Sequence, residues 1–184
     1  VDQLGMPQIK LVSGYLYHET MQPPQRRFHE SEKKYRAIGG GRGGGKTLPG
    51  LVEAIKQSYW YENNYGIILR KTFPELRIST MKDFFDICPE GLVAKHNFTY
   101  NWIELFNWRG HIYRDEGKYT IDEIRKAGGL SQIDFVSFED RQGAYSKFRS
   151  ANLGWFMIDQ AEECSEDIFD ELLNQLRRTP SERR

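Results

Sequence analysis

The stretch Gly40–Thr47, which reads GGRGGGKT, has the residue types needed to hold a polyphosphate. Glycines let successive backbone N–H groups curl toward one anion, and a following helix adds the positive end of its dipole. The stretch fits the pattern G-x-x-x-x-G-K-[ST], in which the lysine reaches the β and γ phosphates and the hydroxyl binds Mg²⁺. A glycine-rich loop that only turns a corner is the alternative. The sequence predicts a nucleotide site formed by Gly40, Gly41, Arg42, Gly43, Gly44, Gly45, Lys46 and Thr47.

A second candidate for metal binding is Asp159, which ends the apolar run WFMI. This is a Walker B pattern, in which a carboxylate at the end of a buried strand helps to hold Mg²⁺ beside the phosphate loop. An aspartate at this place can also be an ordinary helix or turn cap. We expect Thr47 and Asp159 to form the metal site together.

The residues after Asp159 leave the water-activating group open. Gln160 is an amide, which can orient water but cannot act as a general base. Glu162 and Glu163 follow and are the candidate bases, although both could instead be solvated residues in the first turn of the next helix.

The surrounding pattern predicts an α/β fold with a mostly parallel sheet, flanked by helices and carrying a β-hairpin insertion. Apolar residues from Leu48 to Tyr59 recur at helical spacing directly after the glycines. Strands are expected at about 35–39, 65–71, 133–139 and 154–159, the last of them central in the sheet. Helices are expected at 74–87 and at 165–178, where Ser165 can cap the helix. A hairpin is expected within 98–115, with its turn near 107–110. Residues 1–22 are expected to be a leader and residues 23–184 the folded domain.

Composition excludes several classes of protein. Among 184 residues, Lys+Arg and Asp+Glu both number 26, so bulk charge does not attract the chain to nucleic acid. The sequence contains no run of 18 apolar residues, so it does not predict a membrane-spanning helix. Cys88 and Cys164 lack metal-binding spacing, which favours reduced thiols and no metal cluster. The first residue, Val1, and the ending TPSERR suggest a fragment of a longer protein.

Four stretches carry a further signal: QPPQRRFHES (22–31), GGGRGGGKT (39–47), IILRKTFPEL (67–76) and KFRSANLGWFMIDQAEE (147–163). Together they resemble the ATPase domain of the large terminase subunit of tailed bacteriophages. The resemblance implies a RecA-like P-loop NTPase, with Gln25 as the adenine reader and Arg42 lying over the phosphates. It also implies that Arg149 is a finger for the neighbouring subunit.

The resemblance further implies the cofactors, the binding partners and the cellular location of the protein. ATP and Mg²⁺ are the expected cofactors, and double-stranded DNA, the portal protein and the small terminase subunit are the expected partners. A homo-oligomeric ring is expected in the assembled motor, a monomer in isolation, and no membrane. The motor would act in the cytoplasm of the infected host, at the prohead portal, and the full-length parent would also be an endonuclease through a C-terminal nuclease domain absent from this chain.

Two other functions remain open on the sequence alone. One is another P-loop motor on nucleic acid, such as a helicase. The other is a module that binds nucleotide with little turnover, which Gln160 favours because the family usually has a catalytic glutamate at that place.

Overall fold

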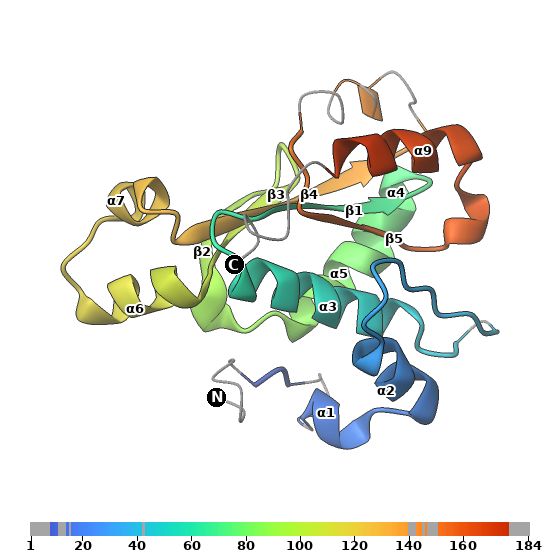
Figure 1. Ribbon diagram of the computed structural model, residues 1–184, viewed down its shortest axis with the longest axis horizontal. Coiled ribbons are helices and arrows are strands. Elements are labelled where there is room, and N and C mark those ends of the chain that lie inside the picture. The colour runs from blue at the N-terminus through green and yellow to red at the C-terminus, as the bar shows by residue number, and fades with distance from the viewer. Residues whose placement is uncertain are drawn as a thin grey trace.

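The computed structural model describes residues 8–10, 14, 16–41, 43–139, 143–144, 146 and 151–176 (Figure 1). The strands are β1 (Tyr65–Arg70), β2 (Val93–Asn97), β3 (Trp102–Phe106), β4 (Leu130–Ser137) and β5 (Trp155–Ile158). The α-helices are α1 (Tyr17–Thr20), α2 (Pro23–Glu30), α3 (Thr47–Trp60), α4 (Phe73–Glu75), α5 (Lys82–Ile87), α6 (Trp108–Glu116), α7 (Ile121–Lys126) and α9 (Glu166–Gln175). A π-helix (Leu76–Met81) joins α4 to α5, and 3₁₀ turns cover Glu90–Leu92 and Ala161–Glu163.

The five strands form one sheet in the order β2-β3-β4-β1-β5. β1 pairs in parallel with both β4 and β5, whereas β3 is antiparallel to both β2 and β4. Only β3 therefore runs against the other strands. The predicted α/β class, with a mostly parallel sheet and a β-hairpin, is confirmed.

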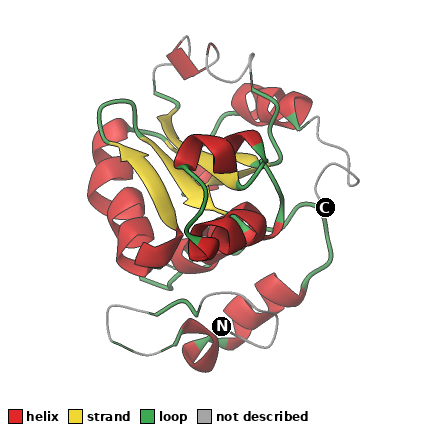
Figure 2. Cartoon of the chain, turned by 90° about the vertical axis from the view of Figure 1, so that its left-hand side faces the viewer, coloured by secondary structure: helices red, strands yellow, loops and turns green. Residues whose placement is uncertain are grey.

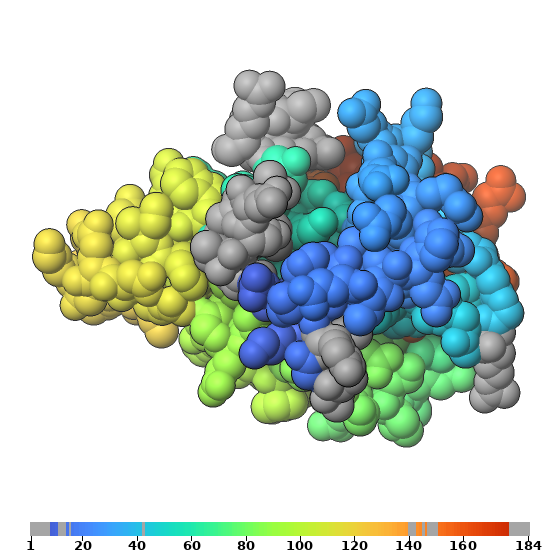
Figure 3. Space-filling view, turned by 90° about the horizontal axis from the view of Figure 1, so that it is seen from below, coloured from blue at the N-terminus to red at the C-terminus, as the bar shows by residue number. Residues whose placement is uncertain are grey.

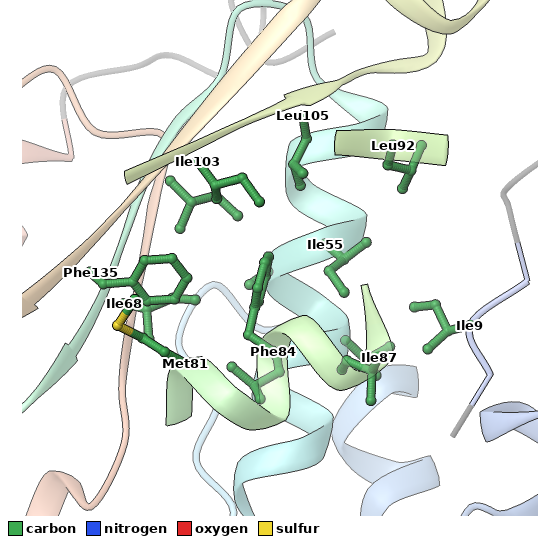
Figure 4. Close-up of a cluster of buried hydrophobic side chains, with 14 of the residues drawn as sticks. Ile9, Ile55, Ile68, Met81, Phe84, Ile87, Leu92, Ile103, Leu105 and Phe135 are labelled. Carbon is green, nitrogen blue, oxygen red and sulfur yellow. The ribbon is translucent and has the colours of Figure 1, made fainter. Parts of the chain in front are cut away.

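Helices cover both faces of the sheet (Figures 1 and 2). Along β1 the side chains alternate between the faces, as a strand requires. Ile68 joins a cluster with residues of α3 and α5, whereas Ile67 and Leu69 pack with Ile168 of α9. Figure 4 shows the first of these clusters between α3, α5 and the sheet. β1 is thus buried on both sides, and its carboxyl end lies next to that of its parallel partner β5.

The helix expected from residue 74 forms with one irregularity. Thr72 caps it, because its hydroxyl oxygen accepts a hydrogen bond from the N–H of Glu75. The Leu76–Met81 segment then widens into a π-helix before α5 continues. Such turns often mark functional sites, and this one lies next to the end of β1.

The strand expected at 35–39, before the glycines, is absent. No strand in the described residues pairs with this segment, and Tyr35 is half exposed. A single extended segment needs a hydrogen-bonded neighbour to become a strand. The related expectation that 154–159 is central is also wrong for the described residues, because β5 ends the sheet and pairs there with β1 alone.

The hairpin exists, but its predicted turn near 107–110 is wrong. β2 and β3 are joined at 98–101, where the Asn97 side chain accepts hydrogen bonds from two backbone N–H groups. The buried Asn107 instead caps α6, with its side-chain oxygen accepting from the N–H of Gly110 at 3.0 Å. Asparagine suits both turns and N-caps, so the residue type alone did not separate the two. At the last helix, Ser165 holds the N-cap position of α9 without a side-chain capping bond.

Part of the segment expected to be a leader packs against the domain. Ile9 and Tyr17 are buried in the same cluster as Leu51 and Ile55 of α3. Figure 3 shows the N-terminal residues, in blue, lying across this face of the molecule. Among the described residues, no helix combines the length and apolar character needed to cross a membrane.

Candidate functional site

The glycine loop leads directly into α3, so its backbone lies at the helix N-terminus. Gly43 and Gly45 have φ values of +78° and +64°, which side-chain-bearing residues rarely adopt. The Lys46 ammonium donates to the carbonyl oxygen of Gly40 at 2.7 Å, so the lysine folds back over the loop. The loop thus combines backbone N–H groups at a helix N-terminus with the Lys46 cation, which fits a polyphosphate.

The loop and the end of β5 meet at Thr47 and Asp159. The Thr47 hydroxyl donates to Oδ1 of Asp159 at 2.9 Å, and Asp159 is only 6% exposed. The backbone N–H of Asp159 donates to Leu69 of β1, which fixes the strand end. Helix α3 lies close to β5 at Gly50. A Cβ at this position would come within 2.6 Å of the Met157 side chain, so the close approach depends on glycine. A hydroxyl and a carboxylate side by side are oxygen ligands of the kind that Mg²⁺ prefers.

Two residues that sequence reasoning missed complete this site. Thr80, which is fully buried in the π-helix, donates to Oδ2 of Asp159 at 2.6 Å. Arg70, the last residue of β1, donates to the same Oδ2 at 3.2 Å and to Thr80 at 3.2 Å. A charged residue ending an apolar strand was a usable signal for Arg70. Nothing in the local sequence singles out Thr80.

Gln160 follows Asp159 in a left-handed conformation, with φ +59° and ψ +58°. Its side-chain oxygen accepts from Nη2 of Arg70 at 2.8 Å. Glu162 and Glu163 lie in the exposed 3₁₀ turn that follows. Glu163 lines a surface pocket with Lys71, Phe138, Glu139, Ser165 and Ile168, none of which belongs to the glycine loop.

Gln25 also touches the glycine loop. It is 6% exposed, and its amide nitrogen donates to the carbonyl oxygen of Gly45 at 3.2 Å. Its amide oxygen accepts from the N–H of Gln22 at 2.9 Å and so caps α2. The amide nitrogen thus joins α2 to the loop, and the amide oxygen caps α2 itself.

A partly buried polar network fastens α2 to α3. His29 lies between the Tyr17 hydroxyl and the Glu53 carboxylate, at 3.0 Å from each, and Arg36 reaches Glu53 at 2.8 Å. Burial would by itself raise the pKa of Glu53, but hydrogen bonds from His29 and Arg36, together with the Arg36 charge, lower it to about 2. Burial and the Glu53 charge raise the pKa of Tyr17. The network holds an ionised carboxylate inside the contact between the two helices.

Two of the residues predicted to act at the site, Arg42 and Arg149, lie outside the described residues. Within the described part of the chain, no cluster of three or more His, Cys, Asp or Glu side chains could hold a metal ion. Cys88 and Cys164 are free thiols.

The chain was compared with protein-family models, with curated proteins and with solved structures. The chain matches no protein-family model and no curated protein. Among solved structures it is similar to the large terminase ATPase domain of Thermus phage P74-26, with a TM-score of 0.61 and 15% identity over 85% of this chain. A single-residue mutant of that domain matches with a TM-score of 0.59, also at 15% identity and 85% coverage. The chain covers 60% and 62% of those two structures' lengths. The fold implied by the sequence resemblance is thus confirmed, and this chain has the fold of a large terminase ATPase domain.

Proposed function

We propose that this chain hydrolyses MgATP as the ATPase of a phage DNA-packaging motor, and that hydrolysis drives double-stranded DNA into the prohead. The observation that carries the proposal is the hydrogen bond between Thr47 and Asp159, 112 residues apart in the chain. This contact joins a phosphate-type loop to an acidic strand end in a fold shared with a terminase ATPase domain. P-loop NTPases pair such a loop with a carboxylate that helps to hold Mg²⁺.

In this proposal each residue at the end of the glycine loop and after β5 has a specific role. Lys46 leaves the Gly40 carbonyl and pairs with the β and γ phosphates, while the loop N–H groups bind the remaining oxygens. Thr47 and Asp159 hold Mg²⁺, which would neutralise charge on the phosphates. Glu162 or Glu163 accepts the proton of the attacking water.

Three further roles complete the proposed site. Gln25 reads adenine from α2, and its present bond to Gly45 supports a place next to the nucleotide. Arg42 lies over the phosphates. Arg149 stabilises the transferred phosphate in a neighbouring subunit, which requires a ring of like subunits.

The partners follow from the motor function and extend beyond this chain. DNA, the portal protein and the small terminase subunit would contact the assembled ring in the host cytoplasm, at the prohead portal. Residues 23–184 would form the ATPase domain of a longer protein that also carries a nuclease domain. The chain covers 60% of the length of the terminase ATPase domain that it resembles.

The direct test compares nucleotide binding by the wild-type chain and by Lys46→Ala, using calorimetry with MgATP and MgADP. Lys46 is near the surface and its ammonium bonds only one loop carbonyl among the described residues, so the variant should fold normally. Affinity should fall because the main cation facing the phosphates is lost. Lys118→Ala, a change at an exposed lysine far along the chain, is the control. Equal affinity for wild type and Lys46→Ala would overturn the nucleotide site.

A second candidate function is a module that binds nucleotide and hydrolyses it little. It is favoured by one observation: the residue after Asp159 is an amide already hydrogen-bonded to Arg70, rather than a carboxylate. Hydrolysis measured in the assembled motor separates the two functions. Tight MgATP binding with no turnover above background would select the binding module.

A further inference from the structure

Arg70 connects the two residues at the end of β5. Nη1 donates to Asp159 at 3.2 Å, and Nη2 donates to the side-chain oxygen of Gln160 at 2.8 Å. The Arg70 side chain is 11% exposed, so little water competes for these bonds. One rigid guanidinium therefore sets the positions of a carboxylate and an amide at the same time.

The chemistry of the pair fixes which way the amide faces. A guanidinium has only N–H donors, so it can meet Gln160 only at the amide oxygen. With that oxygen engaged, the amide nitrogen is the group that Gln160 can direct elsewhere, and the described residues give it no hydrogen-bond partner. An N–H₂ group cannot take a proton from water, but it can donate to an anionic oxygen.

The backbone at Gln160 supports a specific task for this side chain. Its φ of +59° is unfavourable for a residue with a Cβ, and such conformations gather at functional sites. The left-handed turn comes directly after Asp159, whose carboxylate meets the loop hydroxyl of Thr47. The side chain that leaves this turn starts one residue from the proposed metal ligand.

We propose that Arg70 is a positioning residue that makes Gln160 a donor to the γ-phosphate, so that the pair distinguishes a nucleoside triphosphate from a diphosphate. Arg70 binds the amide oxygen, and the amide N–H₂ then donates to an oxygen of the terminal phosphate. Arg70 also donates to Asp159, so the same side chain positions both the residue that recognises the terminal phosphate and the proposed metal ligand. This inference rests on the proposed nucleotide site and adds a role that the sequence did not assign.

Arginine is required for this arrangement, because a lysine ammonium is a single point charge. Lysine could keep the ion pair with Asp159 but could not reach Gln160 with a second fixed donor. Gln160→Ala removes the donor itself. Gln160→Glu replaces it by a carboxylate, which would pair with Arg70 but repel the terminal phosphate.

The test measures the affinity of the 184-residue chain for MgADP and for a non-hydrolysable MgATP analogue, by calorimetry. For Gln160→Ala, the analogue should bind about tenfold more weakly, the effect of one hydrogen bond to a charged group, while ADP affinity is unchanged. Arg70→Lys should give a similar selective loss. The double variant should lose little more than either single variant, because both remove the same donor. Gln160→Glu should bind the analogue at least as weakly as Gln160→Ala.

The outcomes separate this inference from the proposed function. Failure of the wild-type chain to bind either nucleotide overturns the nucleotide site itself. Normal ADP binding with an analogue affinity unaffected by Gln160→Ala and Gln160→Glu overturns only the role of Gln160. Additive losses in the double variant overturn the link to Arg70. If Arg70→Lys does not fold, as judged by circular dichroism, the two Gln160 variants decide whether Gln160 contacts the terminal phosphate.

Discussion

Thr80 and Asp159 lie 79 residues apart in sequence, yet the Thr80 hydroxyl donates to the Asp159 carboxylate at 2.6 Å. The π-helix at Leu76–Met81 brings this hydroxyl to the end of β5. Together with Thr47 and Arg70, it gives the buried carboxylate three donors. A carboxylate with so little contact with water needs such hydrogen-bond partners in place of the water it has lost.

Thr80→Val should destabilise the protein by about 1–3 kcal/mol, the cost of leaving a buried acceptor with one partner fewer. Valine has nearly the same shape, so the change tests the hydroxyl. Urea unfolding measures the difference, and Thr80→Ser, which keeps the hydroxyl, is the control. Equal unfolding free energies for Thr80→Val and the wild type would mean that the bond contributes nothing to stability.

Loss of the general base should be visible in single-turnover hydrolysis by the assembled motor. Glu162→Gln or Glu163→Gln should lower the rate ~10²–10⁴-fold with nucleotide affinity nearly intact. We expect the larger effect from Glu162, because Glu163 lines the pocket beside Lys71. Glu166→Gln, at an exposed acid one position into α9, is the control. If both variants keep the wild-type rate and only Gln160→Ala is slow, the assignment of a glutamate base is wrong.

A finger acting between subunits makes hydrolysis depend on assembly. ATPase activity per subunit should rise with protein concentration, and Arg149→Ala should lower it by ~10³-fold in the assembled state. Mixing Arg149→Ala with Lys46→Ala should restore part of the activity, because one subunit keeps an intact loop and the other supplies the arginine. A mixture as inactive as either variant alone argues against a finger acting across the interface.

The Glu53 network should make stability fall in acid. The pKa of Glu53 is lowered to about 2 in the folded protein, so unfolding takes up a proton below the ordinary value of 4.5. The stabilisation is therefore complete above that ordinary value and is lost as the pH falls toward 2. Urea unfolding at about pH 6 and about pH 3 should show a smaller loss for Glu53→Gln than for the wild type. Glu30→Gln, at an exposed end of α2, should keep the wild-type loss.

The sequence by itself determined the parts of the site that depend on short-range pattern. Glycines before Lys46 and Thr47 predicted a phosphate loop because their backbone freedom and the following helix act locally. The apolar run before Asp159 predicted a buried strand with a carboxylate at its end. Alternation of strands and helices likewise gave the α/β class, since each pattern reflects the faces that one element buries.

Only the tertiary structure decided which distant residues surround Asp159. Arg70 reaches it because β1 pairs with β5, and Thr80 because the helix after β1 contains a π-turn. The place of β5 at the end of the described sheet, and the missing strand before the glycines, depend on which neighbours were available for pairing. Strand pairing and helix packing depend on residues far apart in the sequence. A residue's neighbours in sequence do not indicate which distant group will satisfy its hydrogen bonds.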